Sequence, residues 1–347
     1  MTSVPTRTIG IEIECLLPDG QTRANAAAAV AARLGKPCYA ESYNHRTAAH
    51  WKIVTDGSLS NSVRGMEVVS PKLSGLEGLA EIAKVMDALQ DFGATVDKSC
   101  GFHVHVGAEH DGLPFHKTLA KLYAAFESEI DKLMPASRRG NQNNYCRSIA
   151  HASREQIDHT GSVTELASLL GRTAPAPRYV KLNMTRRHPT VEFRQHSGTL
   201  DSVKATTWIK TCLRLVEKAA AGVEFNPVAP SVSRPKVRRG SKRAICVEML
   251  MRPEGATREQ LLAATGWPTI SVQDVVSRTG WELITTRMGR RITYRLNRAA
   301  AEAHSTTNGQ LDISVAGLCN LIGSTNDERQ YLESRAANLS SAHQWAA

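Results

Sequence analysis

The chain has 347 residues, of which 41% are hydrophobic and 22% charged, and its formal net charge is +10. This length exceeds a typical domain of roughly 150 residues and predicts two domains. No apolar run approaches the roughly 18 residues of a membrane span, and the amino terminus lacks the apolar stretch of a secretory signal. Seven cysteines without a Cys-x-x-Cys pair argue against a disulfide framework. We therefore expect a cytoplasmic globular protein, and the positive charge favours an anionic partner.

The first 222 residues alternate strand patterns with helical ones. Period-two alternation of apolar residues predicts strands, and apolar residues three or four apart predict helices. We expect strands at 8–16, 51–54, 63–70, 101–107, 178–183 and 189–195, and helices at 22–34, 76–92, 116–134 and 202–220. This mixture predicts an α+β domain over residues 1–222, with a mainly antiparallel sheet covered by helices on one face.

The composition changes after this domain. Residues 223–240 carry three prolines and two serines and are typical of a linker. Three helices and a β-hairpin in that order predict a winged helix-turn-helix domain over 241–298. Between Arg234 and Leu296 there are 13 Lys and Arg against 5 Asp and Glu, so this region holds much of the excess positive charge. Residues 299–347 are expected to form a polar helical tail.

The most informative pattern is a set of polar residues placed two apart on predicted strands. Successive side chains of a strand point to opposite faces, so residues i and i+2 share a face. Apolar neighbours would pack the other face into a core. The polar residues are Glu12 and Glu14, Glu67 alone, His103 and His105, and Glu192 and Arg194.

A surface so rich in carboxylate and imidazole favours a metal site, because unpaired buried charge is costly. Carboxylates select hard ions such as Mg²⁺ or Mn²⁺. Other interpretations stay open: Glu12 and Glu14 could face solvent on an edge strand, Glu192 and Arg194 could pair across strands, and Asp56 could belong to an ordinary turn. His103 is the stronger ligand candidate and His105 the weaker.

Five motifs, in this order, resemble the amidoligases related to glutamate-cysteine ligase and glutamine synthetase. The resemblance covers roughly residues 7–220. The chain lacks any stretch that matches the substrate-selecting loops of those two enzymes. The motifs are Gly-Ile-Glu-Ile-Glu, Thr-Asp-Gly-Ser-Leu-Ser, Gly-Met-Glu-Val-Val-Ser-Pro, Gly-Phe-His-Val-His-Val-Gly and Val-Glu-Phe-Arg-Gln-His-Ser-Gly-Thr-Leu-Asp. The resemblance implies a glutamine-synthetase-like antiparallel sheet forming a funnel that binds ATP and metal ions.

The resemblance also implies roles for individual residues. Metal-ligand positions match Glu12, Glu14, Glu67, His103 and Glu192. Arg194 matches an arginine that follows the last ligand, and Asp56 matches an acid of unassigned role. Arg186 and Arg187, in the preceding turn, are candidates for phosphate or substrate carboxylate, and His105 is a further cofactor contact. The implied reaction is ATP-dependent amide formation through an acyl phosphate, with Mg²⁺ or Mn²⁺, from small-molecule or peptide substrates.

The second domain is a candidate for DNA binding. The third helix would present base-contacting residues to a groove, and the wing would meet phosphates. The candidate contacts are Ser271, Gln273, Arg278, Arg290 and Arg291. Winged helices also mediate protein contacts, so a protein partner stays open.

Two other functions compete with the ligase. The spacing of His103, His105 and Glu109 also matches the metal motif of cupin enzymes, although the second motif of that fold is missing from the following strands. Alternatively, the chain could be a DNA-binding regulator whose first domain senses a ligand. The sequence does not identify the acid, the amine or the oligomeric state.

Overall fold

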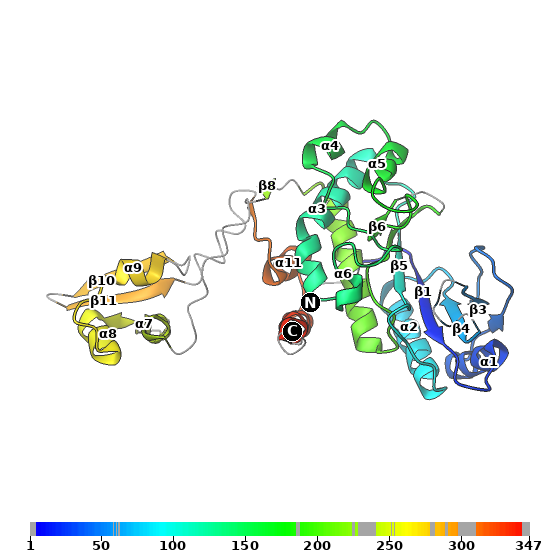
Figure 1. Cartoon of the computed structure of the whole chain (residues 1–347), viewed down its shortest axis with the longest axis horizontal. Coiled ribbons are helices and arrows are strands. Elements are labelled where there is room, and N and C mark those ends of the chain that lie inside the picture. Colours follow the sequence, from blue (N-terminus) through cyan, green and yellow to red (C-terminus); the bar gives the residue numbers. More distant parts are fainter. Residues whose placement is uncertain are drawn as a thin grey trace. The chain divides into compact units, whose positions relative to one another are not determined.

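A computed structural model describes residues 5–57, 59, 61, 63–184, 188–223, 226–227, 241–250, 252, 254–277, 282–288, 291–297 and 310–341. The chain divides into two compact units (Figure 1). Unit 1 comprises Met1–Val223 together with Ser314–Ala347, and unit 2 comprises Glu224–Ile313. None of the helices in the described residues is long and apolar enough to cross a membrane.

Unit 1 is built on a seven-stranded sheet with the order β2-β3-β4-β1-β5-β7-β6. Every neighbouring pair is antiparallel except β2 and β3, which are parallel. The strands are β1 (Ile9–Leu16), β2 (Cys38–Ala40), β3 (Trp51–Thr55), β4 (Gly65–Val69), β5 (Phe102–Gly107), β6 (Leu182–Asn183) and β7 (Thr190–Phe193). The predicted α+β class and antiparallel sheet are confirmed.

One face of this sheet is apolar and fully buried. Ile11, Ile13, Val104 and Phe193 are at most 1% exposed. Each such aliphatic or aromatic side chain contributes about 1.5–3 kcal/mol when it leaves water. Because the side chains alternate along each strand, burial of these residues fixes which residues point to the other face.

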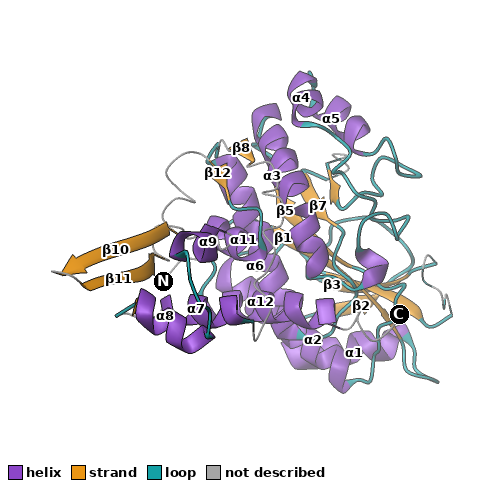
Figure 2. Ribbon diagram, turned by 60° about the vertical axis from the view of Figure 1, so that its left-hand side comes forward, coloured by secondary structure: helices purple, strands orange, loops and turns teal. Residues whose placement is uncertain are grey.

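Helices cover the apolar face. The main ones are α1 (Arg23–Leu34), α2 (Gly75–Asp91), α3 (Leu113–Lys132) and α6 (Ser202–Ala220). In Figure 2, α1, α2 and α6 lie together on one side of the strands. Helix α1 begins where the Thr22 side chain accepts a hydrogen bond from the Asn25 amide, and it ends at Gly35, whose φ of 65° suits glycine.

Parts of the predicted element pattern were wrong. The strand expected at 178–183 is only β6, because residues before it make a single bridge between Arg147 and Val180. Strand β2 was not predicted. Three short helical elements between α3 and β6 were also missed, namely η1 (Ala136–Arg138), α4 (Arg154–His159) and α5 (Val163–Leu170).

The carboxyl-terminal helices belong to unit 1, which differs from the separate tail expected at 299–347. These helices are α11 (Val315–Ile322) and α12 (Asn326–Ser341), and they pack on α3 and α6. Glu328 of α12 forms a buried ion pair with Arg214 of α6. The Arg335 Nε atom donates to the Leu133 carbonyl at 2.6 Å. Helices α11 and α12 therefore extend the helical layer of unit 1.

Unit 2 has its own small core. Its elements are α7 (Lys242–Leu250), β9 (Ala256–Thr257), α8 (Arg258–Thr265), α9 (Val272–Ser277), β10 (Glu282–Met288) and β11 (Arg291–Asn297). The three strands form an antiparallel sheet in the order β10-β11-β9. Leu250, Leu261, Val275 and Leu296 pack in the core. Two short connecting strands, β8 (Asn226–Pro227) and β12 (Gln310–Leu311), pair in parallel.

Candidate active site

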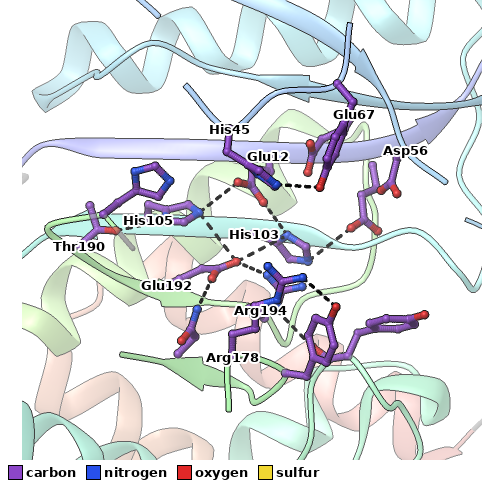
Figure 3. A pocket seen from close by; sticks show the side chains of 16 residues that line it. Glu12, His45, Asp56, Glu67, His103, His105, Arg178, Thr190, Glu192 and Arg194 are labelled. Atoms are coloured by element: carbon purple, nitrogen blue, oxygen red, sulfur yellow. Dashed lines mark hydrogen bonds and ion pairs between the residues drawn. The ribbon is translucent and has the colours of Figure 1, made fainter. Parts of the chain in front are cut away.

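The register of the sheet brings the predicted polar residues together on its second face. Glu12 lies opposite His103, Glu14 lies opposite Glu67, and His105 lies opposite Glu192. Directly opposed residues of an antiparallel pair point to the same face, so these side chains converge. Figure 3 shows the labelled side chains pointing into one hollow, which Glu14 also lines.

His103 is at the centre of the hollow and is only 3% exposed. Its Nδ1 atom lies 2.9 Å from Glu12 Oε2 and 3.8 Å from Glu192 Oε1. Its Nε2 atom lies 3.6 Å from Glu14 Oε1. The imidazole therefore stands between two sets of carboxylates.

Glu192 is held by groups on both sides. Asn183 on β6 donates to Glu192 Oε2 at 2.7 Å, and Arg194 Nη1 donates to Glu192 Oε1. Arg194 Nε also donates to the Tyr145 carbonyl at 3.2 Å. Burial opposes ionisation of Glu192, but Arg194 and His105 outweigh this effect and lower its pKa. Glu192 and Arg194 thus form an ion pair at the edge of the hollow.

His105 and Glu12 form a second contact on the same wall. His105 Nε2 lies 3.3 Å from Glu12 Oε1, and His105 Nδ1 lies 3.1 Å from Thr190 Oγ1. Burial disfavours a charged His105, yet the carboxylates of Glu192 and Glu12 raise its pKa. Burial likewise opposes ionisation of Glu12, but His103 and His105 hold its pKa well below the ordinary value.

Glu67 has the opposite electrostatic environment. Burial, together with the carboxylates of Glu12, Glu14 and Asp56, raises its pKa well above the ordinary value. Such crowding of acids is unfavourable unless a cation or a proton neutralises it. This part of the hollow therefore has the charge that a divalent cation would balance.

Gly101 lies beside the acids, immediately before β5. The Gly101 amide donates to Glu14 Oε2. A Cβ atom at Gly101 would lie 2.8 Å from His103 Nε2, closer than real Cβ contacts, and 3.1 Å from Glu14 Oε2, which is tighter than most of them. Arg138 supports the same turn by donating to the carbonyls of Ser99 and Cys100. The backbone at Gly101 is therefore in direct contact with the polar cluster.

Two groups among the described residues have the donor set and spacing for a metal ion. Glu12, His103 and Glu192 form one, and Glu14, Glu67 and His103 form the other, with the ligand atoms of each group within 4.8 Å of one another. Oxygen ligands with one imidazole suit Mg²⁺ or Mn²⁺. The residues present therefore fit divalent cations. The cupin set is not assembled, since neither group includes His105 or Glu109.

The other predicted site residues have mixed outcomes. Asp56 lines the hollow with Glu67. Arg186 and Arg187 lie outside the described residues, as do Arg278 and Arg290 of unit 2. The side chain of Arg291 is likewise not described, whereas Ser271 and Gln273 are exposed beside and on α9.

The comparison with family models decides the family. Residues 5–216, more than half of the chain, match the model of the family described as "Putative amidoligase enzyme". This chain belongs to the amidoligase family. The match spans every strand of the large sheet and all of the predicted metal ligands. Residues 235–278 also match DUF3489, a family of unknown function.

Solved structures resemble this amidoligase only distantly. One is the complex of the prokaryotic ubiquitin-like protein Pup with its ligase PafA, with 12% identity and a TM-score of 0.36 over 98% of this chain and 66% of that chain. Another is Plasmodium falciparum glutamine synthetase, with 11% identity and a TM-score of 0.33 over 98% and 73%. Scores this low do not support transfer of fold details or function. No curated protein gave a match.

Sequence reasoning missed several residues that line the hollow of this amidoligase. Most of them lie in irregular segments, and Asn183 and Thr190 stand at the ends of the short strands β6 and β7, so no long alternating pattern marks them. Tyr145 and Tyr179 form an edge-to-face pair with ring centroids 5.1 Å apart, and Arg178 lies over the Tyr179 ring. The full set of missed residues is Tyr43, His45, Tyr145, Arg178, Tyr179, Asn183, His188 and Thr190.

A second hollow adjoins the first on the same face of the sheet. The two share Glu12, Glu67, His105 and further side chains. The second hollow extends past Gly10 and Ser70 to Lys52, Arg46 and Lys72. Together the two hollows form one groove, with acidic side chains where they meet and basic side chains in the second hollow.

Proposed function

We propose that this amidoligase joins a carboxylate to an amine at the expense of ATP, through an acyl phosphate. The observation that carries the proposal is the convergence of Glu12, Glu14, Glu67 and Glu192 around His103 in one hollow. Nucleoside triphosphates enter enzymes as complexes with divalent cations, which need acidic ligands around an open site.

The ligands divide into two proposed sites. His103 directs Nδ1 toward Glu12 and Glu192, and Nε2 toward Glu14. A neutral imidazole has one lone pair for a metal, so His103 serves one ion at a time. We assign His103 to the first ion, together with Glu12 and Glu192, because its shortest carboxylate contact is the one to Glu12. Glu14 and Glu67 are assigned to the second ion. When bound, these cations neutralise phosphate charge and orient the reactants.

In the proposed reaction, an oxygen of the substrate carboxylate bonds to the γ-phosphorus of ATP, and the bond to the β,γ-bridging oxygen breaks to release ADP. The amine nitrogen then bonds to the acyl carbon, phosphate leaves, and the nitrogen loses a proton. The residues of the groove hold both reactants and limit access of water, because water would hydrolyse the acyl phosphate. The acid and the amine are small molecules or peptides.

Arg194 is the proposed catalytic cation. Its guanidinium lies at the edge of the hollow beside Glu192, where it can donate two hydrogen bonds to a phosphoryl group. Charge gathers on the phosphoryl oxygens during transfer, so a positioned guanidinium stabilises the transition state. Asp56 and Arg187 are further proposed catalytic groups, and Arg186 and His105 proposed ATP contacts.

The test is ADP release with Mg²⁺ across a panel of amino acids, polyamines and peptides. We expect one acid and amine pair to stimulate ADP release, and Glu192→Gln to abolish the stimulation without loss of fold. If Glu192→Gln still released ADP and bound the metal with unchanged affinity, the assignment of Glu192 as a metal ligand would be wrong. If the acid and the amine were joined without release of ADP, the proposed use of ATP would be wrong.

For unit 2 we propose a winged helix-turn-helix that binds DNA or a protein partner and brings the ligase to it. The order of its helices, with β10 and β11 as a hairpin, supports the proposal. On α9, Val272 and Val275 are buried while Gln273 and Asp274 are exposed, so one side of the helix is available to a partner. Salt-sensitive binding to duplex DNA that drops with Arg290→Ala and Arg291→Ala would support DNA; no gel shift at low salt would contradict it.

A further inference from the structure

The segment between β2 and β3, residues 41–50, covers part of the groove. Tyr43 and His45 line the first hollow, and Asn44, Arg46 and Thr47 line the second. Figure 3 shows His45 beside the carboxylates of Glu12 and Glu67. This segment is therefore the one irregular stretch of the described chain that contributes to both hollows from the β2–β3 edge of the sheet.

Lys52 on β3 holds the middle of this segment. Its Nζ atom donates to Asn44 Oδ1 at 2.6 Å, to the Arg46 carbonyl at 2.7 Å and to the Asn44 carbonyl at 3.3 Å. An ammonium group has three protons, so these acceptors satisfy it completely. Lys52 is therefore committed to the segment and has no donor left for a substrate.

The burial of Lys52 makes this arrangement specific. The residue is 1% exposed. Lys52 on β3 and Glu12 on β1 lie on the two sides of Val69 of β4, each paired with it in the sheet. Burial lowers its pKa, while the carboxylates of Glu41 and Glu67 act against that shift. An ammonium removed from water is costly unless its protons are bonded, so segment 41–50 has to remain in place while Lys52 stays buried.

The segment is also stiffened internally. Asn44 Nδ2 donates to Glu41 Oε2 at 2.9 Å, and Glu41 Oε1 lies 2.7 Å from His50 Nε2. The Tyr43 hydroxyl lies 2.9 Å from His45 Nε2. Fixing Asn44 therefore fixes its neighbours on both sides, Tyr43 and His45, which face the hollow.

We propose that Lys52 is a positioning residue that holds residues 44–46 over the groove, so that Tyr43 and His45 contact the nucleotide bound there. The first half of this inference, that Lys52 holds residues 44–46 in place, is based on the hydrogen bonds alone. The second half rests on the proposed function, because it takes the groove as the ATP site.

Trypsin tests the first half without any activity. The Arg46 side chain is 81% exposed, but its carbonyl, at the scissile Arg46–Thr47 bond, accepts a hydrogen bond from Lys52. We expect Lys52→Met to be cut at this bond about tenfold faster than the wild type, because a charged hydrogen bond no longer opposes opening. Lys84→Met, which changes an exposed lysine of α2, is the matched control and should be cut at the wild-type rate.

Asn44→Ala is the second variant, since it removes one acceptor and leaves the sheet intact. It should also speed cleavage at Arg46–Thr47. Unchanged cleavage at this bond in both variants, with wild-type circular dichroism, would overturn the positioning role.

Calorimetry with Mg²⁺ and ATP tests the second half. We expect Lys52→Met and His45→Ala each to weaken ATP binding about tenfold, and Lys52→Met to add less than about twofold when His45 is already alanine. Additive losses would overturn action through His45. If the wild type binds no ATP, the proposed function and the second half fail together, whereas the trypsin result still decides the first half.

Discussion

Glu12 on β1 and His103 on β5 lie directly opposite each other in the sheet, with Glu12 Oε2 2.9 Å from His103 Nδ1. The two residues are 91 positions apart in the sequence, and the register of a single antiparallel strand pair places them in contact. The same register brings the remaining acids to this contact. The chemistry of the site therefore depends on strand pairing, and changes to the backbone beside it should be as damaging as changes to the ligands.

Gly101→Ala tests this dependence on the backbone. The new Cβ atom would lie 2.8 Å from His103 Nε2, so the imidazole or the strand has to shift. We expect Mn²⁺ affinity to fall about tenfold or more while the far-ultraviolet circular dichroism is unchanged, since displaced ligands bind a metal poorly. Gly112→Ala is the control, because its Cβ atom would make an ordinary contact of 3.6 Å. Equal Mn²⁺ affinity in both variants would contradict the geometry described for the turn.

Arg194→Met separates binding from chemistry. If the guanidinium stabilises the phosphoryl group in transfer, ATP turnover should fall by about a thousandfold. Mn²⁺ binding should change far less, because Arg194 is not in either ligand group. The measurements are single-turnover ADP formation and Mn²⁺ titration of the same preparation. A loss in metal affinity as large as the loss in rate would show that Arg194 supports the metal site instead.

Lys181→Met tests a buried ion cluster beneath the site. Lys181 is completely buried, and its Nζ atom lies 2.8 Å from Glu127 Oε1 and 2.6 Å from Asp131 Oδ1. Removing the ammonium group leaves two carboxylates without a neutralising cation, which should lower the free energy of unfolding by about 3 kcal/mol. Urea unfolding measures this loss. Lys132→Met, at a half-exposed lysine, should cost less than about 1 kcal/mol.

The ion pair of Glu328 with Arg214 should make the stability of the folded chain depend on pH. Although burial opposes its ionisation, the Arg214 guanidinium lowers the pKa of Glu328 from 4.5 to about 2. The pKa is lower in the folded chain, so this stabilisation is complete above pH 4.5 and is lost as the pH falls toward 2.

Thermal unfolding between pH 7 and pH 2.5 tests this dependence in the wild type and in Glu328→Gln. The variant should be less stable at pH 7 by about 2 kcal/mol, as expected for loss of a charged hydrogen bond, and the difference should shrink at low pH. A difference that stays constant across this range would contradict the assignment.

The strand residues of the site could be predicted from the sequence, because the alternation of apolar and polar residues along one strand shows which side chains share a face. Glu12, Glu14, His103 and Glu192 share a face for the same reason that Ile11 and Ile13 share the other. The pairing of the strands, and with it the contacts between the side chains, is a long-range property that alternation alone does not specify.

The loop residues could not be predicted in this way. Tyr43, His45 and Tyr145 occupy irregular segments. Lys52 bonds to Asn44, between the first two, and Arg194 bonds to the Tyr145 carbonyl, so partners elsewhere in the chain help to place them. The packing of α12 was missed for a similar reason. Its sequence is polar, and the contacts that hold it on unit 1 are long-range ones, such as the ion pair between Glu328 and Arg214, which are 114 positions apart.

The most direct test of the whole account is Mn²⁺ titration, followed by electron paramagnetic resonance, of the wild type, Glu12→Gln and Glu14→Gln. The account predicts two Mn²⁺ ions per wild-type chain in the presence of ATP and the loss of a different ion in each variant. Wild-type Mn²⁺ binding in both variants would contradict the claim that these strands hold divalent cations.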